Sequence, residues 1–158
     1  MTAGQERTAT VPPRAFVRTA WVLHRALLRL SGGRIGLRPP GKAFGMLKLS
    51  TVGRRSGQAR VAIVGYYEDG PNLVTLAMNG WGEAEPAWWL NLQANPDAVV
   101  DLRDGPRAVR ARAAGPDERP RLWARWAEYD GADLDAFAAR RSRETAVVIL
   151  SPRPEAAA

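Results

Sequence analysis

One ten-residue segment has the composition of a site that binds an anionic group. Residues 51–60 read TVGRRSGQAR and combine three arginines with two hydroxyls and two glycines. Arginine is always charged and presents a planar fork of donors that matches phosphate and carboxylate oxygens. Hydroxyls add neutral donors, and glycine allows positive φ or close approach of the backbone to a ligand. The candidate anion-binding residues are Thr51, Gly53, Arg54, Arg55, Ser56, Gly57 and Arg60.

The flanks of this segment indicate that it connects two strands. Apolar runs with strand-like composition precede it at 44–49 and follow it at 61–67, so the sequence predicts a hairpin. Short glycine and arginine patterns also recur in solvated hairpins that bind nothing. The choice between a ligand-binding site and an ordinary basic turn therefore depends on the rest of the sequence.

Length and composition describe an ordinary globular domain. The chain has 158 residues, of which 46% are hydrophobic and 25% charged, and this size fits one domain with an N-terminal extension. It has no cysteine and a single histidine, His24. Disulfides, thiolate ligands and histidine clusters are therefore ruled out, and a protein-bound catalytic metal is not expected.

The net charge of +7 is compatible with three classes of partner: nucleic acid, a membrane surface and an anionic cofactor. The arginines are spread along the chain. A sheet surface that binds nucleic acid would need aromatic residues on its strands among the basic ones, and this chain has few in that arrangement. Nucleic acid is therefore the weakest of the three. No apolar run has the length of a membrane span, and the N-terminus lacks a signal-peptide core, so a cytoplasmic protein is expected.

The chain before the main domain divides into three parts. Residues 1–13 are polar and end in two prolines, as expected for a disordered arm. Residues 14–30 predict a basic amphipathic helix, and 31–42 read as a linker rich in glycine and proline. The helix could lie on an anionic membrane surface, giving a membrane-associated protein, or pack on its own domain, and the second is favoured. Its apolar face would consist of Val17, Ala20, Trp21, His24, Leu27 and Leu28.

Residues 43–152 predict one α+β domain, followed by a tail at 153–158. Strands are expected at 44–49, 61–67, 73–78, 98–102, 107–113 and 146–150, and helices at 86–95, 117–129 and 134–141. Because these elements do not alternate as βαβ units, an antiparallel sheet or barrel with peripheral helices fits best. The predicted core is thus a barrel of about six strands.

Two motifs in this domain carry a resemblance to a known family. TxGRxSGxxR at the hairpin and WxxNLxANP on the helix that follows it are similar, in order and spacing, to the deazaflavin-dependent nitroreductase family. The similarity covers residues 44–152. It implies a split β-barrel that binds the deazaflavin F420, without a metal, and transfers a hydride to an electrophilic organic substrate such as a quinone, an enone, a nitro compound or a biosynthetic intermediate. FMN is the alternative cofactor, because related split barrels use it.

The resemblance also implies which residues meet the cofactor. The arginine hairpin would bind its phosphate and glutamyl carboxylates, while the next strand and a later strand end would line the deazaflavin ring. For the two helix residues of this set a simpler role is also open. Trp88 could pack in the core, and Asn91 could hydrogen-bond to local backbone. The implied cofactor-binding residues are Thr51, Arg54, Arg55, Ser56, Gly57, Arg60, Ala62, Ile63, Val64, Ala77, Met78, Asn79, Gly80, Trp88 and Asn91.

The substrate pocket and the proton donor are less constrained. Met78, Trp81, Leu134 and Phe137 would suit a bulky, apolar or aromatic substrate by side-chain character. A proton must also reach the reduced substrate. Three tyrosines or solvent could supply it, and the sequence does not choose among Tyr66, Tyr67, Tyr129 and water.

The chain departs from the family pattern at three places. Met78 and Asn79 stand where members often carry a serine followed by lysine or asparagine, Ala146 replaces a common proline, and residues 128–145 are poorer in tyrosine. Two other classes of function therefore stay open, a non-catalytic split barrel that binds a hydrophobic ligand or lipid, and a membrane-surface protein that acts through residues 14–30. The chain could be a monomer or a homodimer.

Overall fold

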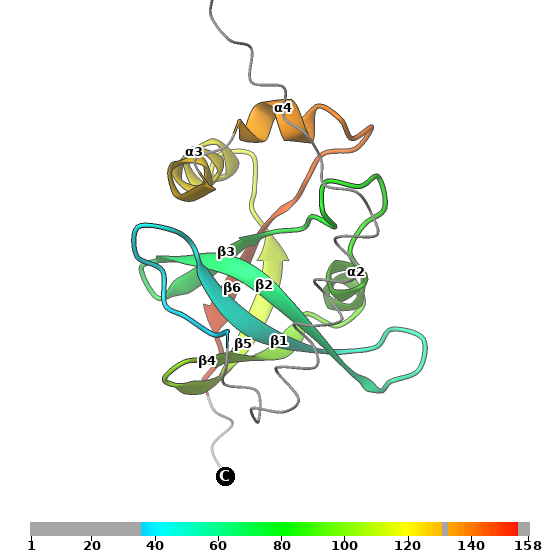
Figure 1. The fold of residues 1–158 in the computed structure, drawn as a ribbon. Coiled ribbons are helices and arrows are strands. Elements are labelled where there is room, and N and C mark those ends of the chain that lie inside the picture. The colour runs from blue at the N-terminus through cyan, green and yellow to red at the C-terminus, as the bar shows by residue number, and fades with distance from the viewer. Residues whose placement is uncertain (1–35, 131–132, 155–158) are drawn as a thin grey trace, which may run out of the picture.

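A computed structural model describes residues 36–130 and 133–154 of the chain (Figure 1). The predicted arm at 1–13, the predicted amphipathic helix at 14–30 and the end of the predicted tail at 155–158 lie outside the described residues. Within the described part, no helix has both the length and the apolar character needed to cross a membrane.

Six strands form a closed barrel in which every neighbouring pair is antiparallel (Figure 1). The order around the barrel is β1-β2-β3-β6-β5-β4, and β4 closes it by pairing with β1. The predicted six-stranded antiparallel barrel is therefore confirmed. The strands are β1 (Gly45–Val52), β2 (Ala59–Asp69), β3 (Asn72–Leu76), β4 (Asp97–Leu102), β5 (Gly105–Ala113) and β6 (Val147–Pro152).

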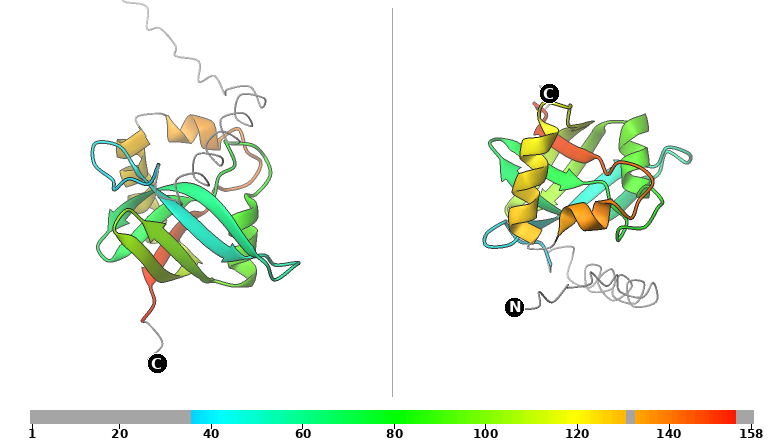
Figure 2. Two further views of the ribbon diagram at one scale, coloured as in Figure 1. Left: turned by 60° about the horizontal axis from the view of Figure 1, so that its bottom comes forward. Right: turned by 90° about the horizontal axis from the view of Figure 1, so that it is seen from above.

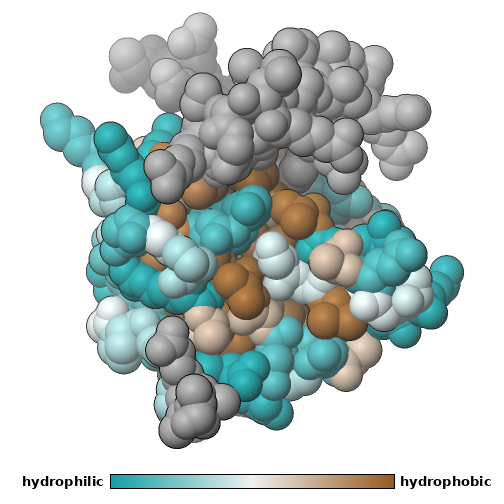
Figure 3. Space-filling view, turned by 90° about the horizontal axis from the view of Figure 1, so that it is seen from below, coloured by the Kyte–Doolittle hydropathy of each residue, from teal (hydrophilic) through white to brown (hydrophobic). Residues whose placement is uncertain are grey.

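Alternation along the strands fills the interior of the barrel. On β1, Leu47 and Leu49 point inward and are fully buried, whereas Lys48 between them pairs with Asp101 at the surface. This period of two is the expected signature of a strand with one buried face. The face seen from below carries apolar side chains near its centre and hydrophilic ones around them (Figure 3).

Three helices cover the barrel, α2 (Ala87–Ala94), α3 (Arg119–Asp130) and α4 (Leu134–Ala138). Helix α2 contacts β1, β2 and β5, and its Trp88, Trp89 and Leu92 join the apolar cluster of the barrel interior. Helices α3 and α4 lie together on another side (Figures 1 and 2). They bury a second apolar cluster with outward-facing residues of β2, β3 and β6, formed by Tyr67, Val74, Leu76, Leu122, Trp126, Leu134, Val147 and Ile149.

Strand β2 has a long edge that is not paired with another strand within the described residues. Its first eight residues pair with β1 from Ala59 to Tyr66, but its pairing with β3 is confined to Tyr67, Glu68 and Asp69. The edge of β2 that faces away from β1 thus lacks a strand partner along residues 59–66. Such an edge offers backbone donors and acceptors and leaves room beside the strand for a ligand.

Some boundaries differ from those expected from sequence. Strand β3 ends at Leu76, two residues before the predicted end, and α4 ends at Ala138 and not at 141. In both places the following residues turn to make contacts inside the protein: the amide of Ala77 donates to Ala146, and the Arg141 side chain is buried. The last part of the predicted linker also packs on the barrel, since Leu37 contacts Ile63 and Arg38 forms an isolated bridge with Met46.

The buried phenol of Tyr67 makes stability fall at high pH. Its hydroxyl donates to the carbonyl oxygen of Leu122 at 2.9 Å, and burial raises its pKa from 10.0 to about 12. Because the unfolded chain ionises first, this stabilisation is complete below about pH 10 and is lost as pH rises toward 12. Urea unfolding at about pH 8 and about pH 11 should show a larger loss for the wild type than for Tyr67→Phe. Equal losses in the two proteins would contradict this assignment.

Candidate active site

A large cavity runs along the unpaired edge of β2. Its volume is about 1110 Å³, slightly above the range of about 300–1,000 Å³ for small-molecule and cofactor sites. Its walls are formed by the β1–β2 hairpin, by β2 itself, by the segment from the end of β3 into α2, by the chain around the start of β1, and by Trp126 of α3. The lining residues are Phe44, Met46, Thr51, Gly53, Arg54, Arg55, Ser56, Arg60, Val61, Ala62, Ile63, Val64, Gly65, Thr75, Leu76, Met78, Asn79, Gly80, Pro86, Ala87, Trp88, Asn91 and Trp126.

The hairpin gives the cavity a positively charged end. Its turn is closed by two backbone hydrogen bonds of 2.8 Å, from the amide of Gly53 to Gln58 and from the amide of Gly57 to Gly53. Arg54, Arg55 and Arg60 are exposed. None of them takes part in an ion pair among the described residues. Their charges are therefore available to an anion.

Asn91 fixes the hairpin to α2. Its side-chain oxygen accepts hydrogen bonds from the Arg54 amide at 3.2 Å and from Arg54 Nη1 at 3.3 Å, and its amide nitrogen donates to Thr51 Oγ1 at 3.1 Å. Only 4% of Asn91 is exposed. The two simple sequence readings for Asn91 were a cofactor contact and a bond to nearby backbone. The hydrogen bonds of its side chain reach a hairpin far away in sequence and hold Arg54 in place, and Asn91 also lines the cavity, where the cofactor contact stays a prediction.

An aromatic wall forms the apolar part of the cavity. Phe44 and Trp126 stack with ring centroids 5.6 Å apart, and both line the cavity. They lie against Gly65 of β2, where an added Cβ would come within 2.9 Å of Phe44 Cδ2 and 3.4 Å of Trp126 Cη2. A glycine inside a strand often marks such a close approach. The sequence prediction did not include these three residues, and Gly65 was the signal that could have pointed to them.

The loop after β3 makes a tight turn beside the cavity. Gly80 and Trp81 have φ of 56° and 59°, and the amide of Gly82 donates to the carbonyl of Asn79 at 3.0 Å. Positive φ is strained for a residue such as tryptophan. The ring of Trp81 stacks on Phe137 of α4 at 5.7 Å, and this contact supports the conformation. Met78, Asn79 and Gly80 are left facing the cavity.

Most of the implied cofactor residues come together in this cavity. Thirteen of the fifteen named above are in its lining, and the two outside it are Gly57 and Ala77. Gly57 supplies the positive φ of 67° that closes the hairpin turn. Ala77 is fully buried, its amide bonded to Ala146 and its carbonyl to Arg141. Both residues act through backbone geometry.

The other predicted residues are mostly placed elsewhere. Of the predicted substrate pocket, Met78 lines the cavity, whereas Trp81, Leu134 and Phe137 belong to the packing of the loop against α4. None of the three tyrosines lines it. The hydroxyl of Tyr67 is bonded to Leu122, Tyr129 stacks on Tyr67, and Tyr66 borders a second, smaller cavity. Burial raises the pKa of Tyr66 as well.

The chemistry of the lining is unusual for an enzyme that works through its own side chains. Apart from the three arginines, none of the described residues that line the cavity carries an ionisable side chain, so this lining offers no carboxylate, imidazole, thiol or amine for acid–base or nucleophilic catalysis. Such a site can bind, orient and exclude water. The reactive group must then belong to a bound cofactor.

Comparison with known proteins agrees with this geometry. A solved F420-H2 dependent reductase, FDR-A, is 22% identical with a TM-score of 0.60, covering 73% of this chain and all of that one. A structure described as a domain-swapped dimer has a TM-score of 0.65 at 23% identity, covering 85% of this chain and 99% of the other. The fold is therefore that of the split-barrel reductases.

Sequence comparison gives the family. The model of the F420H(2)-dependent quinone reductases matches residues 21–152. An F420H(2)-dependent quinone reductase of Mycobacterium tuberculosis is 35% identical over 135 residues, which cover 83% of this chain and 89% of that protein. The chain belongs to the F420H(2)-dependent quinone reductase family and is an F420-dependent oxidoreductase. The expected family resemblance and cofactor are confirmed, and the FMN alternative gains no support.

Proposed function

We propose that the protein reduces a quinone with a hydride from reduced F420, and that both molecules occupy the cavity beside β2. The observation that carries this proposal concerns the described lining of the cavity: a hairpin with three arginines that form no ion pair within the described part of the chain, and other walls without ionisable groups. The arginines suit an anionic cofactor tail, and the uncharged walls suit a flat conjugated ring.

The residues present fit F420. Arg54, Arg55 and Arg60 would bind phosphate and carboxylate oxygens, and three forked cations suit a long polyanion better than the single phosphate of FMN. Ala62 and Val64 of β2 with Met78 and Trp88 would pack on the deazaflavin. The free edge of β2 adds backbone hydrogen-bonding groups beside them. When bound, F420 supplies the hydride.

The protein's own contribution is to position the two reactants and to keep water from the ring. Bringing reactants together in the correct geometry is worth several kcal/mol of barrier, roughly 7–11 in favourable cases. The quinone gains a hydride and one proton. Since none of the described lining side chains is an acid that could give up a proton near neutral pH, we expect the proton to come from water.

A quinone is favoured over an enone or a nitro compound because of the family membership and the walls. The aromatic pair Phe44 and Trp126 and the side chain of Met78 give apolar contact to a fused ring. Away from the hairpin, the neutral side chains of Thr75 and Asn79 would offer hydrogen bonds to its oxygens.

The test is the oxidation of reduced F420 by purified protein with a naphthoquinone, a cyclic enone or a nitroaromatic compound as acceptor. We expect the naphthoquinone to have the highest kcat/KM. Ala62→Trp, which fills the cavity from β2, should abolish turnover, whereas Val99→Trp on the exposed outer face of β4 should leave it unchanged. Equal turnover in Ala62→Trp, or preference for either other acceptor, would contradict the proposal.

A further inference from the structure

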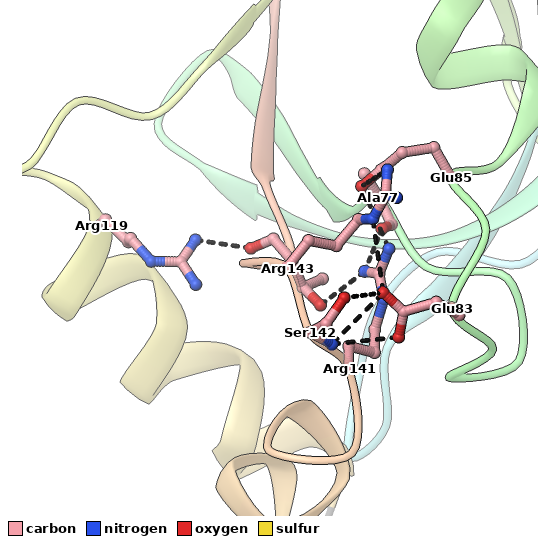
Figure 4. Close-up of polar contacts among 8 residues, drawn as sticks. Ala77, Glu83, Glu85, Arg119, Arg141, Ser142 and Arg143 are labelled. Atoms are coloured by element: carbon pink, nitrogen blue, oxygen red, sulfur yellow. Dashed lines mark hydrogen bonds and ion pairs between the residues drawn. The ribbon is translucent and has the colours of Figure 1, made fainter.

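Arg141 makes polar contacts with the loop that follows β3 (Figure 4). The side chain of Arg141 has no solvent exposure. Its Nη1 donates to the carbonyl of Ala77 at 3.2 Å and to Thr145 Oγ1 at 2.7 Å, and its Nη2 donates to Glu85 Oε1 at 3.0 Å. One guanidinium therefore connects three separate points of the chain.

Two of these points are the ends of the segment that forms a wall of the cavity. Ala77 directly precedes Met78, Asn79 and Gly80, and Glu85 directly precedes Pro86 and the first turn of α2. The residues after each anchor line the cavity, while the anchors themselves do not. Arg141 therefore determines how far apart the two ends of the segment lie.

The arginine is itself held from the opposite side. Arg119 of α3 donates to the carbonyl of Thr145 at 2.6 Å, and the amide of Ser142 donates to Glu83 Oε2 at 3.0 Å. The hydroxyl of Ser142 also donates to Glu83 (Figure 4). The segment 141–145 is thus fixed both to α3 and to the loop, which makes it a firm support for the wall.

Stability alone does not account for this arrangement. Burying an ion pair costs desolvation energy that its Coulomb attraction often fails to recover, and an apolar pair of similar volume is frequently as stable. The pair is also incompletely satisfied, because Glu85 Oε2 and Arg141 Nε are buried without a hydrogen-bond partner. What the arginine uniquely provides is a fixed geometry between Ala77 and Glu85, since its planar fork sets the directions of its hydrogen bonds.

We propose that Arg141 is a positioning residue for hydride transfer, acting through Ala77 and Glu85 on the wall formed by Met78, Asn79 and Gly80. This inference rests on the proposed function. The wall would set the depth at which the reacting rings meet, whereas the arginine hairpin, on a different wall, would account for most of the cofactor affinity.

The decisive variant removes the hydrogen bonds that fix Ala77 and Glu85 relative to each other but leaves no unpaired buried charge. In Arg141→Met combined with Glu85→Gln, the unfolding midpoint should stay near that of the wild type, because both buried charges are removed together. In the cofactor-free protein, hydrogen exchange of residues 77–86 should become faster. The dissociation constant for oxidised F420 should change by less than about twofold, and kcat should fall by about 10- to 100-fold, the cost of misplaced reactants.

The matched control is Arg112→Met with Glu118→Gln, which removes an exposed ion pair joined by hydrogen bonds of 2.7 and 2.8 Å. This control should change neither the hydrogen exchange of residues 77–86 nor kcat. Unchanged exchange, or faster exchange with a normal kcat, would overturn the proposal. If the double variant does not fold, the same measurements on Arg141→Lys decide, with faster exchange and reduced kcat again expected. If the wild type binds no F420, the proposed function fails, while the exchange experiment still tests whether Arg141 fixes the wall.

Discussion

Replacing Arg54 and Arg55 together with alanine is expected to weaken F420 binding by about 100-fold, because each charge-assisted hydrogen bond to phosphate or carboxylate contributes on the order of 1.5–3 kcal/mol. Both arginines line the cavity, and neither takes part in an ion pair among the described residues. Arg54 is further oriented by Asn91. The measurement is a fluorescence titration of each protein with oxidised F420.

A matched control separates this local effect from the loss of net charge. Arg107→Ala with Arg110→Ala removes two exposed arginines of β5 that lie outside the cavity lining. Because these two arginines contribute only long-range attraction that salt screens, F420 affinity should change by less than about threefold. If both double variants lost affinity equally, binding would depend on overall charge, and the hairpin would not be a specific site.

Trp126→Ala should produce the largest loss of stability, about 3–5 kcal/mol, the usual cost of deleting a buried aromatic ring. Trp126 is 1% exposed, stacks on Phe44, and contacts Tyr67 at a centroid distance of 5.7 Å. A loss of this size is a large share of the total stability of a small domain, which is about 5–15 kcal/mol. Urea unfolding near neutral pH measures it.

Two further variants test whether that loss of stability comes from the buried ring of Trp126. Trp123→Ala, on the same helix but only partly buried, should cost about 1 kcal/mol. Trp126→Phe should cost less than Trp126→Ala, because it keeps a ring and removes an indole nitrogen that is buried without a partner. A loss in Trp126→Ala no larger than in Trp123→Ala would mean that the aromatic wall is not part of the core.

The features that could be predicted from sequence depend on contacts close together in the chain. The alternation in β1 and the glycines of the 51–60 turn are local signals, and the hairpin they predict is present. The apolar run of β6 likewise predicts a buried strand. Local patterns of this kind indicate the hairpins β1–β2, β2–β3 and β4–β5, whereas the pairs that close the barrel, β1–β4, β3–β6 and β5–β6, join strands far apart in the chain.

The features that escaped prediction arise from long-range packing. Tyr66 and Tyr67 were candidates for a proton donor by residue type, but burial and the hydrogen bond to Leu122 decide their environment. Trp81 and Phe137 were expected in the substrate pocket, yet they stack on each other. The role of Arg141 likewise depends on contacts with Ala77 and Glu85, and no local pattern indicates that its side chain is buried.

The central claim, that the cavity beside β2 binds F420 through the arginine hairpin, is tested most directly by titrating the full-length protein with oxidised F420 and, separately, with FMN. We predict saturable binding of one F420 per chain at micromolar concentration, much weaker binding of FMN, and F420 binding weakened by about 100-fold in the Arg54→Ala, Arg55→Ala variant. FMN binding as tight as that of F420, or F420 binding unaffected by the two substitutions, would contradict the claim.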